Sequence, residues 1–263
     1  MVFSVSDLKG VSLHATDGDI GHVRDVYFDD ERWVVRYFIV ETGPLIFGTE
    51  VLLSPASVET IDAQSRRIHV DLTIEEIKGS PSIDLRKPVS RREEERFLQY
   101  YNLAPYWAGP DIWATAAYAR GLPPLEGEGP ELPAPHAEDR SEQRLRSCAE
   151  IMGYAVGTVD GSAGYVEDFL VELETWRLRY LVVDSRKLLP GKRVLVSPDW
   201  VEGIRWVDRT VGVNLRTEVI RDAPAYAGVS DLGERYEASL RSHFDTDAGN
   251  EVRMHEREQG QQG

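Results

Sequence analysis

Apolar and polar residues alternate along two stretches that are far apart in the chain. Every second residue is large and apolar in both: Trp33, Val35, Tyr37 and Ile39 in the first, and Trp176, Leu178, Tyr180 and Val182 in the second. A period of two is typical of a β-strand with one buried face. Shorter apolar runs occur near residues 22–28, 51–53, 58–61 and 68–72. Short strands at such regular spacing predict a mainly β fold, a small sandwich or barrel.

The two stretches belong to an internal repeat. Residues 8–81 align with residues 151–224 without a gap, at a constant offset of 143, as in 160 − 17 for Asp160 and Asp17. About a third of the aligned positions are identical. The repeat continues beyond the strands, where Val89, Glu94, Phe97 and Tyr101 align with Leu232, Glu237, Leu240 and Phe244. Each copy is therefore predicted to be one β-rich module with a trailing helix.

The regions outside the strands complete the predicted domain organisation. Ser90 followed by Glu93 fits a capping box at the start of the first trailing helix. Prolines and glycines dominate after the helix and indicate a linker, whose first half is rich in aromatic residues. We expect a first module at 1–85, its helix at 86–103, the linker at 104–146, a second module at 147–225, its helix at 226–245 and a disordered tail at 246–263.

Four sequence segments carry a resemblance to a known family. They are "DGDIGHVRDVYFDDERWVVRYFIVETG", its partner "DGSAGYVEDFLVELETWRLRYLVVDSR", and the "VLLSP" or "VLVSP" that follows each. Together they resemble the PRC-barrel family, which includes the cytoplasmic domain of the photosynthetic reaction centre H subunit. The stretch "KPVSRREEERFLQYYNLAPYW" also resembles bacterial proteins that carry two such barrels in tandem. The resemblance implies two small PRC-type β-barrels in tandem, used for docking and without a shared catalytic motif.

Composition narrows the possible partners. The formal net charge is −15 and the pI about 4.9, which disfavours binding to the phosphate backbone of nucleic acids. Cys148 is the only cysteine, so the chain has no internal disulfide. The best apolar stretch, residues 34–40, is too short to cross a bilayer. We therefore expect a cytoplasmic protein, and leave peripheral membrane association and the oligomeric state open.

One group of residues near the first turn has metal-ligand chemistry. Imidazoles and carboxylates come together at His14, Asp17, Asp19 and His22. The second copy has Gly157, Asp160, Ser162 and Tyr165 at these positions, which keeps one of the four ligands. This loss favours a local Asx turn at the aspartate over a metal site.

A second pair of candidates is Asp25 and Asp168, which lie on the apolar side of equivalent strands. A carboxylate in such a place needs hydrogen-bond partners. We expect backbone donors or the equivalent arginines, Arg36 and Arg179, and hence a structural role.

No pattern indicates an enzyme. Cys148 has no surrounding motif, and neither a nucleophile elbow nor a phosphate-binding glycine loop is found. The basic stretch at 86–96 is neutralised by Glu93, Glu94 and Glu95, which favours a solvated helix face. We expect no catalytic, cofactor-binding or metal-binding residues.

The sequence favours a non-catalytic binding or scaffold protein with an unidentified protein partner. Two alternatives stay open. One is a peripheral component of a membrane or photosynthetic electron-transfer complex, by analogy with the H subunit. The other is a small-ligand or metal sensor, with Trp107 and Trp113 lining a pocket between barrels and linker.

Overall fold

The computed structural model describes residues 1–42, 49–62, 65–81, 89–103, 105, 145–185 and 192–245. Its contacts divide the chain into two compact units. The first unit consists of Met1, Phe3–Glu150 and Val171–Leu178, and the second of Val2, Ile151–Leu170 and Arg179–Gly263. The first unit thus includes a short segment from much later in the chain, which the repeat alone does not predict.

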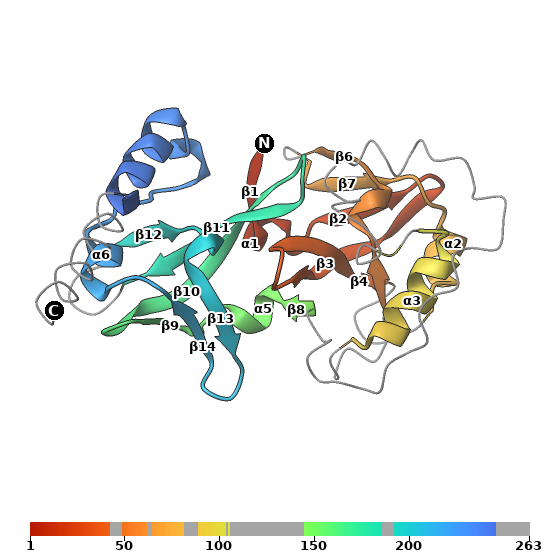
Figure 1. Ribbon diagram of the computed structural model, residues 1–263. Coiled ribbons are helices and arrows are strands. Elements are labelled where there is room, and N and C mark those ends of the chain that lie inside the picture. Colours follow the sequence, from red (N-terminus) through yellow and green to blue (C-terminus); the bar gives the residue numbers. More distant parts are fainter. Residues whose placement is uncertain are drawn as a thin grey trace, which may run out of the picture. The chain divides into compact units, whose positions relative to one another are not determined.

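The first copy of the repeat begins with short elements and continues into a β-sheet (Figure 1). Its elements are β1 (Val2–Ser4), α1 (Val5–Leu8), β2 (Ser12–Ala15), β3 (Gly18–Asp29), β4 (Val34–Thr42), β5 (Thr49–Leu53), η1 (Pro55–Ser57), β6 (Val58–Asp62), β7 (Arg67–Val70), α2 (Ile74–Lys78) and α3 (Arg91–Tyr100). The short apolar runs seen in the sequence all correspond to strands.

The second copy repeats this order. Its elements are β8 (Leu145–Ser147), α5 (Cys148–Ile151), β9 (Ala155–Thr158), β10 (Gly161–Glu172), β11 (Arg177–Asp184), β12 (Arg193–Val196), η3 (Pro198–Trp200), β13 (Val201–Arg205), β14 (Thr210–Val213), α6 (Thr217–Asp222) and η4 (Val229–Asp231), followed by a helix at 234–245. Nearly every repeated element begins 143 positions later, as in 161 − 18 for β10 and β3. The last two residues of the predicted linker, at 145 and 146, are strand; its positions 104 and 106–144, and the predicted tail at 246–263, lie outside the described residues.

Both copies pair their strands in the same order. The order is β5-β4-β3-β2-β7-β6 in the first and β12-β11-β10-β9-β14-β13 in the second. In each copy one pair is parallel, β2 with β7 and β9 with β14. The mainly β class is confirmed. In the described part of each copy the pairing has two free ends, so closure into barrels stays a prediction.

Strand β4 is buried on both faces, which corrects the prediction of a single buried face. Val35, Tyr37 and Ile39 are buried as expected, but so are Phe38 and Val40 on the other side. The strand is central to its sheet, with α3 on one side and apolar residues of the unit on the other. A strand covered on both faces loses its alternation of apolar and polar residues.

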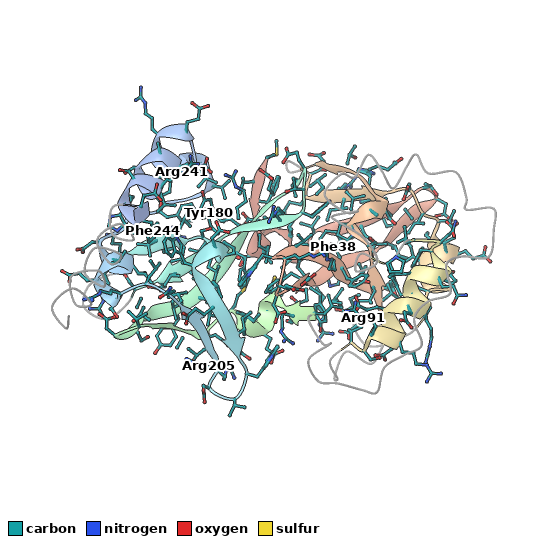
Figure 2. The ribbon with its side chains drawn as sticks, in the orientation of Figure 1. Phe38, Arg91, Tyr180, Arg205, Arg241 and Phe244 are labelled. Carbon is teal, nitrogen blue, oxygen red and sulfur yellow. The ribbon has the colours of Figure 1, made fainter. Side chains whose placement is uncertain are left out.

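Helix α3 docks on β4 through an aromatic contact and a buried polar one (Figure 1). The expected capping box is present, with Ser90 and Glu93 each accepting a backbone N–H of the other. The ring of Phe97 meets that of Tyr37 edge-on, with centroids 5.0 Å apart. In the second copy Leu240 and Phe244 of the helix at 234–245 are buried; Phe244 is labelled in Figure 2. A trailing helix therefore follows each copy.

Candidate functional site

The aspartate of the repeated Asp-Gly turn accepts a hydrogen bond from the first residue of a helix in both copies. Asp17 Oδ1 accepts the N–H of Ile74, at 2.8 Å. Its counterpart Asp160 accepts the N–H of Thr217 at 2.8 Å, and these hydrogen bonds hold the pKa of Asp160 below its usual value. The predicted Asx turn is thus wrong for Asp17: its side chain reaches the first residue of α2, not the next residues of its own turn.

The repeated tryptophans also have structural roles. Trp33 and Trp176 both have positive φ angles, 56° and 57°, and both are buried. In the first unit Trp176 packs edge-on against Phe38, with centroids 5.2 Å apart. The backbone oxygen of Trp176 accepts the N–H of Val35 and that of Trp33 accepts the N–H of Leu178. The indoles are therefore used by the fold itself.

Asp25 accepts hydrogen bonds from backbone and hydroxyl donors. Of the two expected kinds of partner, backbone donors or Arg36, the structure has the first. Its carboxylate accepts hydrogen bonds from the N–H of Val26 (2.7 Å), the N–H of Ala149 (3.1 Å) and the hydroxyl of Ser147. The alternative pairing with Arg36 is wrong, because Arg36 forms a buried ion pair with Asp29, at 3.2 Å.

In the second copy the equivalent aspartate and arginine have the following contacts. Asp168 accepts the N–H of Phe169, at 2.8 Å. Arg179 pairs with Glu237 at 3.0 Å. The arginines of the motif therefore bind other carboxylates, Asp29 in one copy and Glu237 in the other.

Burial raises the pKa of Asp25 despite its three hydrogen-bond donors. A carboxyl whose pKa is higher in the folded than in the unfolded chain favours folding below the unfolded pKa and loses that contribution as the pH rises through the folded one. The ionised carboxylate of Asp25 thus lowers stability at neutral pH relative to its protonated form.

Two substitutions of Asp25 are expected to separate its hydrogen bonds from its charge. Asp25→Ala leaves the donors of Ser147 and Ala149 without this acceptor and should lower the free energy of unfolding by about 1–3 kcal/mol. Asp25→Asn keeps one hydrogen-bond acceptor but cannot ionise. Wild type loses stability as its carboxyl ionises between pH 4 and pH 7, so the melting temperature of Asp25→Asn minus that of wild type should increase over this range. Thermal melts at both pH values measure this; an unchanged melt for Asp25→Ala would reject the structural role.

The four candidate metal ligands do not come together. His14 Nδ1 lies 2.5 Å from Asp19, whereas His22 lies 3.5 Å from Glu41, and Asp17 is bound to α2. Within the described ranges, no group of three or more histidine, cysteine, aspartate or glutamate side chains is arranged to hold a metal ion. The structure instead places His69 beside His14, which sequence reasoning missed because it looked along one turn rather than across strands.

The predicted solvated face of the 86–96 stretch needs a correction at Glu94. This residue is buried, where it accepts the hydroxyl of Tyr37 at 3.1 Å and pairs with Arg91 at 3.4 Å. The counterpart Glu237 likewise accepts the hydroxyl of Tyr180, at 3.4 Å. The glutamate is therefore a repeated docking residue of the trailing helix.

Of the three remaining candidates the structure describes one. Cys148 is fully buried at the start of α5. Trp107 and Trp113 lie outside the described residues.

The copies differ along one row of cross-strand neighbours on the outward face of the sheet. In the first copy one row of neighbours across β6, β7, β2 and β3 consists of Thr60, His69, His14 and Asp19. The equivalent row across β13, β14, β9 and β10 consists of Gly203, Gly212, Gly157 and Ser162. The row thus carries polar side chains, two of them imidazoles, in the first copy, and three glycines and a serine in the second.

The second copy also exposes large apolar side chains beside its glycine row. Tyr165 is 53% exposed on β10, and Val207 is 97% exposed in the turn between β13 and β14. Arg205, labelled in Figure 2, lies at the end of β13, in the cross-strand row that leads through Thr210 and Ala155 to Tyr165. We call Tyr165, Arg205 and Val207 the exposed patch. Sequence reasoning missed the exposed patch because it compared the two copies for identical residues, and the patch lies at positions where the copies differ.

Comparison with known protein families gives a match in the first copy of the repeat. Residues 1–77 match the model of the PRC-barrel domain. A PRC-barrel domain is therefore found at residues 1–77. No curated protein matches the chain. Among the residues that the structure describes, no helix is long and apolar enough to cross a membrane.

Proposed function

We propose that this chain is a non-catalytic binding protein that presents two PRC-type barrels to a protein partner in the cytoplasm. The second barrel rests on the order of elements after β8, which follows that of the PRC-barrel domain at residues 1–77. Two linked modules also allow bivalent binding, in which the first contact raises the effective concentration for the second.

One observation supports a binding role above all: the residues shared by the copies are used internally, and the outward residues differ. Asp17, Trp33 and Glu94, like their counterparts, contact the chain's own backbone and side chains. Duplicated modules that keep their interiors and change their surfaces are suited to contacts with different partner surfaces.

The exposed patch is the proposed contact on the second copy. Val207, in a hairpin turn, is nearly fully exposed, and a tyrosine and an arginine are residue types enriched where partners bind. The net charge of −15 favours a partner that is basic overall, whereas Arg205 in the patch suits an acidic group opposite it, beside the apolar contact with Val207.

Val207→Asp is expected to reduce the amount of partner recovered with the chain by about tenfold or more, because it places a charge at the proposed apolar contact. The test is quantitative mass spectrometry after mild cross-linking in native cells. Val159→Asp is the matched control: Val159 is also exposed, at 57%, but follows β9, at the opposite end from the β13–β14 turn. Recovery of the chain alone, or equal loss in both variants, would contradict the proposal.

A further inference from the structure

His14 and His69 are direct neighbours on the parallel strands β2 and β7. Their ring centroids are 5.3 Å apart, and the ring planes are inclined by 33°. Their neighbours Leu13, Ile68 and Val70 are buried in the unit, so both imidazoles lie on the outward face of the sheet. The two rings thus lie side by side at the surface.

This spacing matches that of two imidazoles on one metal ion. With metal–nitrogen bonds of about 2.0–2.1 Å, each ring centre lies roughly 3.2 Å from the ion, and two imidazoles at a tetrahedral angle have centres about 5.2 Å apart. We propose that His14 and His69 together bind a divalent transition-metal ion of the Zn²⁺, Ni²⁺ or Cu²⁺ class. This binding activity goes beyond the docking function proposed above.

The carboxylate of Asp19 orients the imidazole of His14, one of the two proposed ligands. This carboxylate lies 2.5 Å from His14 Nδ1, which leaves Nε2 of that ring as the ligand atom. A carboxylate in this position fixes the ring orientation and increases the basicity of the metal-binding nitrogen. His14 is only 14% exposed whereas Asp19 is 77% exposed, so the ring is held in place while the carboxylate faces solvent.

The ligand types determine the class of ion. Imidazole nitrogen suits zinc, nickel and copper, whereas calcium and magnesium prefer oxygen ligands. The described ranges hold no group of three or more histidine, cysteine, aspartate or glutamate side chains around one point, so the proposed site consists of two imidazoles, with water as the remaining ligands. Such a site binds more weakly than a closed structural zinc site.

The site belongs to the first copy alone. The positions of His14, His69 and Asp19 are taken in the second copy by Gly157, Gly212 and Ser162. The other described histidines have different partners: His22 lies against Glu41, and His243 Nε2 is 2.8 Å from the backbone oxygen of Val219. His22 therefore provides a control on the same face of the same unit.

The test is isothermal titration of the full, tag-free and metal-depleted chain with ZnCl₂, repeated with NiCl₂. Wild type should bind one equivalent, and His14→Gln and His69→Gln should each weaken binding at least tenfold. Asp19→Asn should weaken it by about tenfold, because the ring loses its orienting carboxylate. His22→Gln should bind like wild type. Melts in EDTA check that each variant folds, and zinc should raise the melting temperature of wild type and of His22→Gln alone.

Three outcomes would overturn the proposal. These are absence of zinc binding by wild type, wild-type affinity in both His14→Gln and His69→Gln, and an equal loss in His22→Gln. Wild-type affinity in Asp19→Asn would remove the positioning role of that carboxylate.

Discussion

Replacing Gly21 by alanine is expected to destabilise the first unit by about 3 kcal/mol or more, with a fall in melting temperature of roughly 10 °C. A Cβ atom at Gly21 would lie 1.9 Å from the backbone oxygen of Glu41, on the neighbouring strand β4. A backbone atom in a paired strand cannot move aside without loss of the pairing. Gly164 stands in the same relation to the oxygen of Asp184, at 2.1 Å, so alanine there should have a similar effect.

Gly203→Ala is the matched control for this experiment. Gly203 is also a strand glycine, but a Cβ there has no heavy atom within 4 Å. Its stability should change by no more than about 0.5 kcal/mol. Thermal melts of the three variants measure the contrast, and a Gly21→Ala chain that melts with wild type would show that the close approach is not maintained.

The second large effect is expected from Phe97→Ala in α3. The side chain is fully buried between the rings of Tyr37 and Tyr101, at centroid distances of 5.0 and 4.8 Å. Loss of the ring leaves a cavity under the helix and should cost about 3–5 kcal/mol. Denaturant unfolding gives the free energy, and the rate of tryptic cleavage within α3 should rise because the helix undocks more often.

Arg92→Ala serves as the control, because Arg92 is exposed on the same helix. It should leave the free energy of unfolding within about 0.5 kcal/mol of wild type. If Phe97→Ala were as stable as Arg92→Ala, the docking of α3 would not contribute to the stability of the unit.

Much of the fold was predictable because each element occurs twice in the sequence, so that a pattern in one copy could be checked in the other. The strands, the capping box at Ser90 and the trailing helices follow from periodicity and from residues that match at a fixed offset. The burial of both faces of β4 was not predictable, because Arg36 in the strand sequence suggested a polar face. That arginine is buried against Asp29, a pairing across the turn that no local pattern marks.

The candidate sites were less predictable because they depend on cross-strand neighbours. His14 and His69 are 55 positions apart, 69 − 14, and meet only because β2 pairs with β7 in parallel. Two of the three hydrogen-bond donors to Asp25, Ser147 and Ala149, lie beyond the proline-rich region, where no sequence rule connects them to β3. The residues that are identical in the two copies support the fold. Residues found in one copy alone, such as His14 and His69, are not marked by the repeat.

Strand β8 pairs with β3 inside the first unit, with Ser147 opposite Tyr27 and Leu145 opposite Asp29. The stretch recognised as a PRC-barrel domain, residues 1–77, is therefore shorter than the body that folds around it. A gene cut after residue 77 would encode a fragment with a bare strand edge at β3 and an aspartate deprived of two donors. The first copy of the repeat is therefore not self-sufficient, because residues 145–149, which precede the second copy's β9, complete its strand pairing and the hydrogen bonds of Asp25.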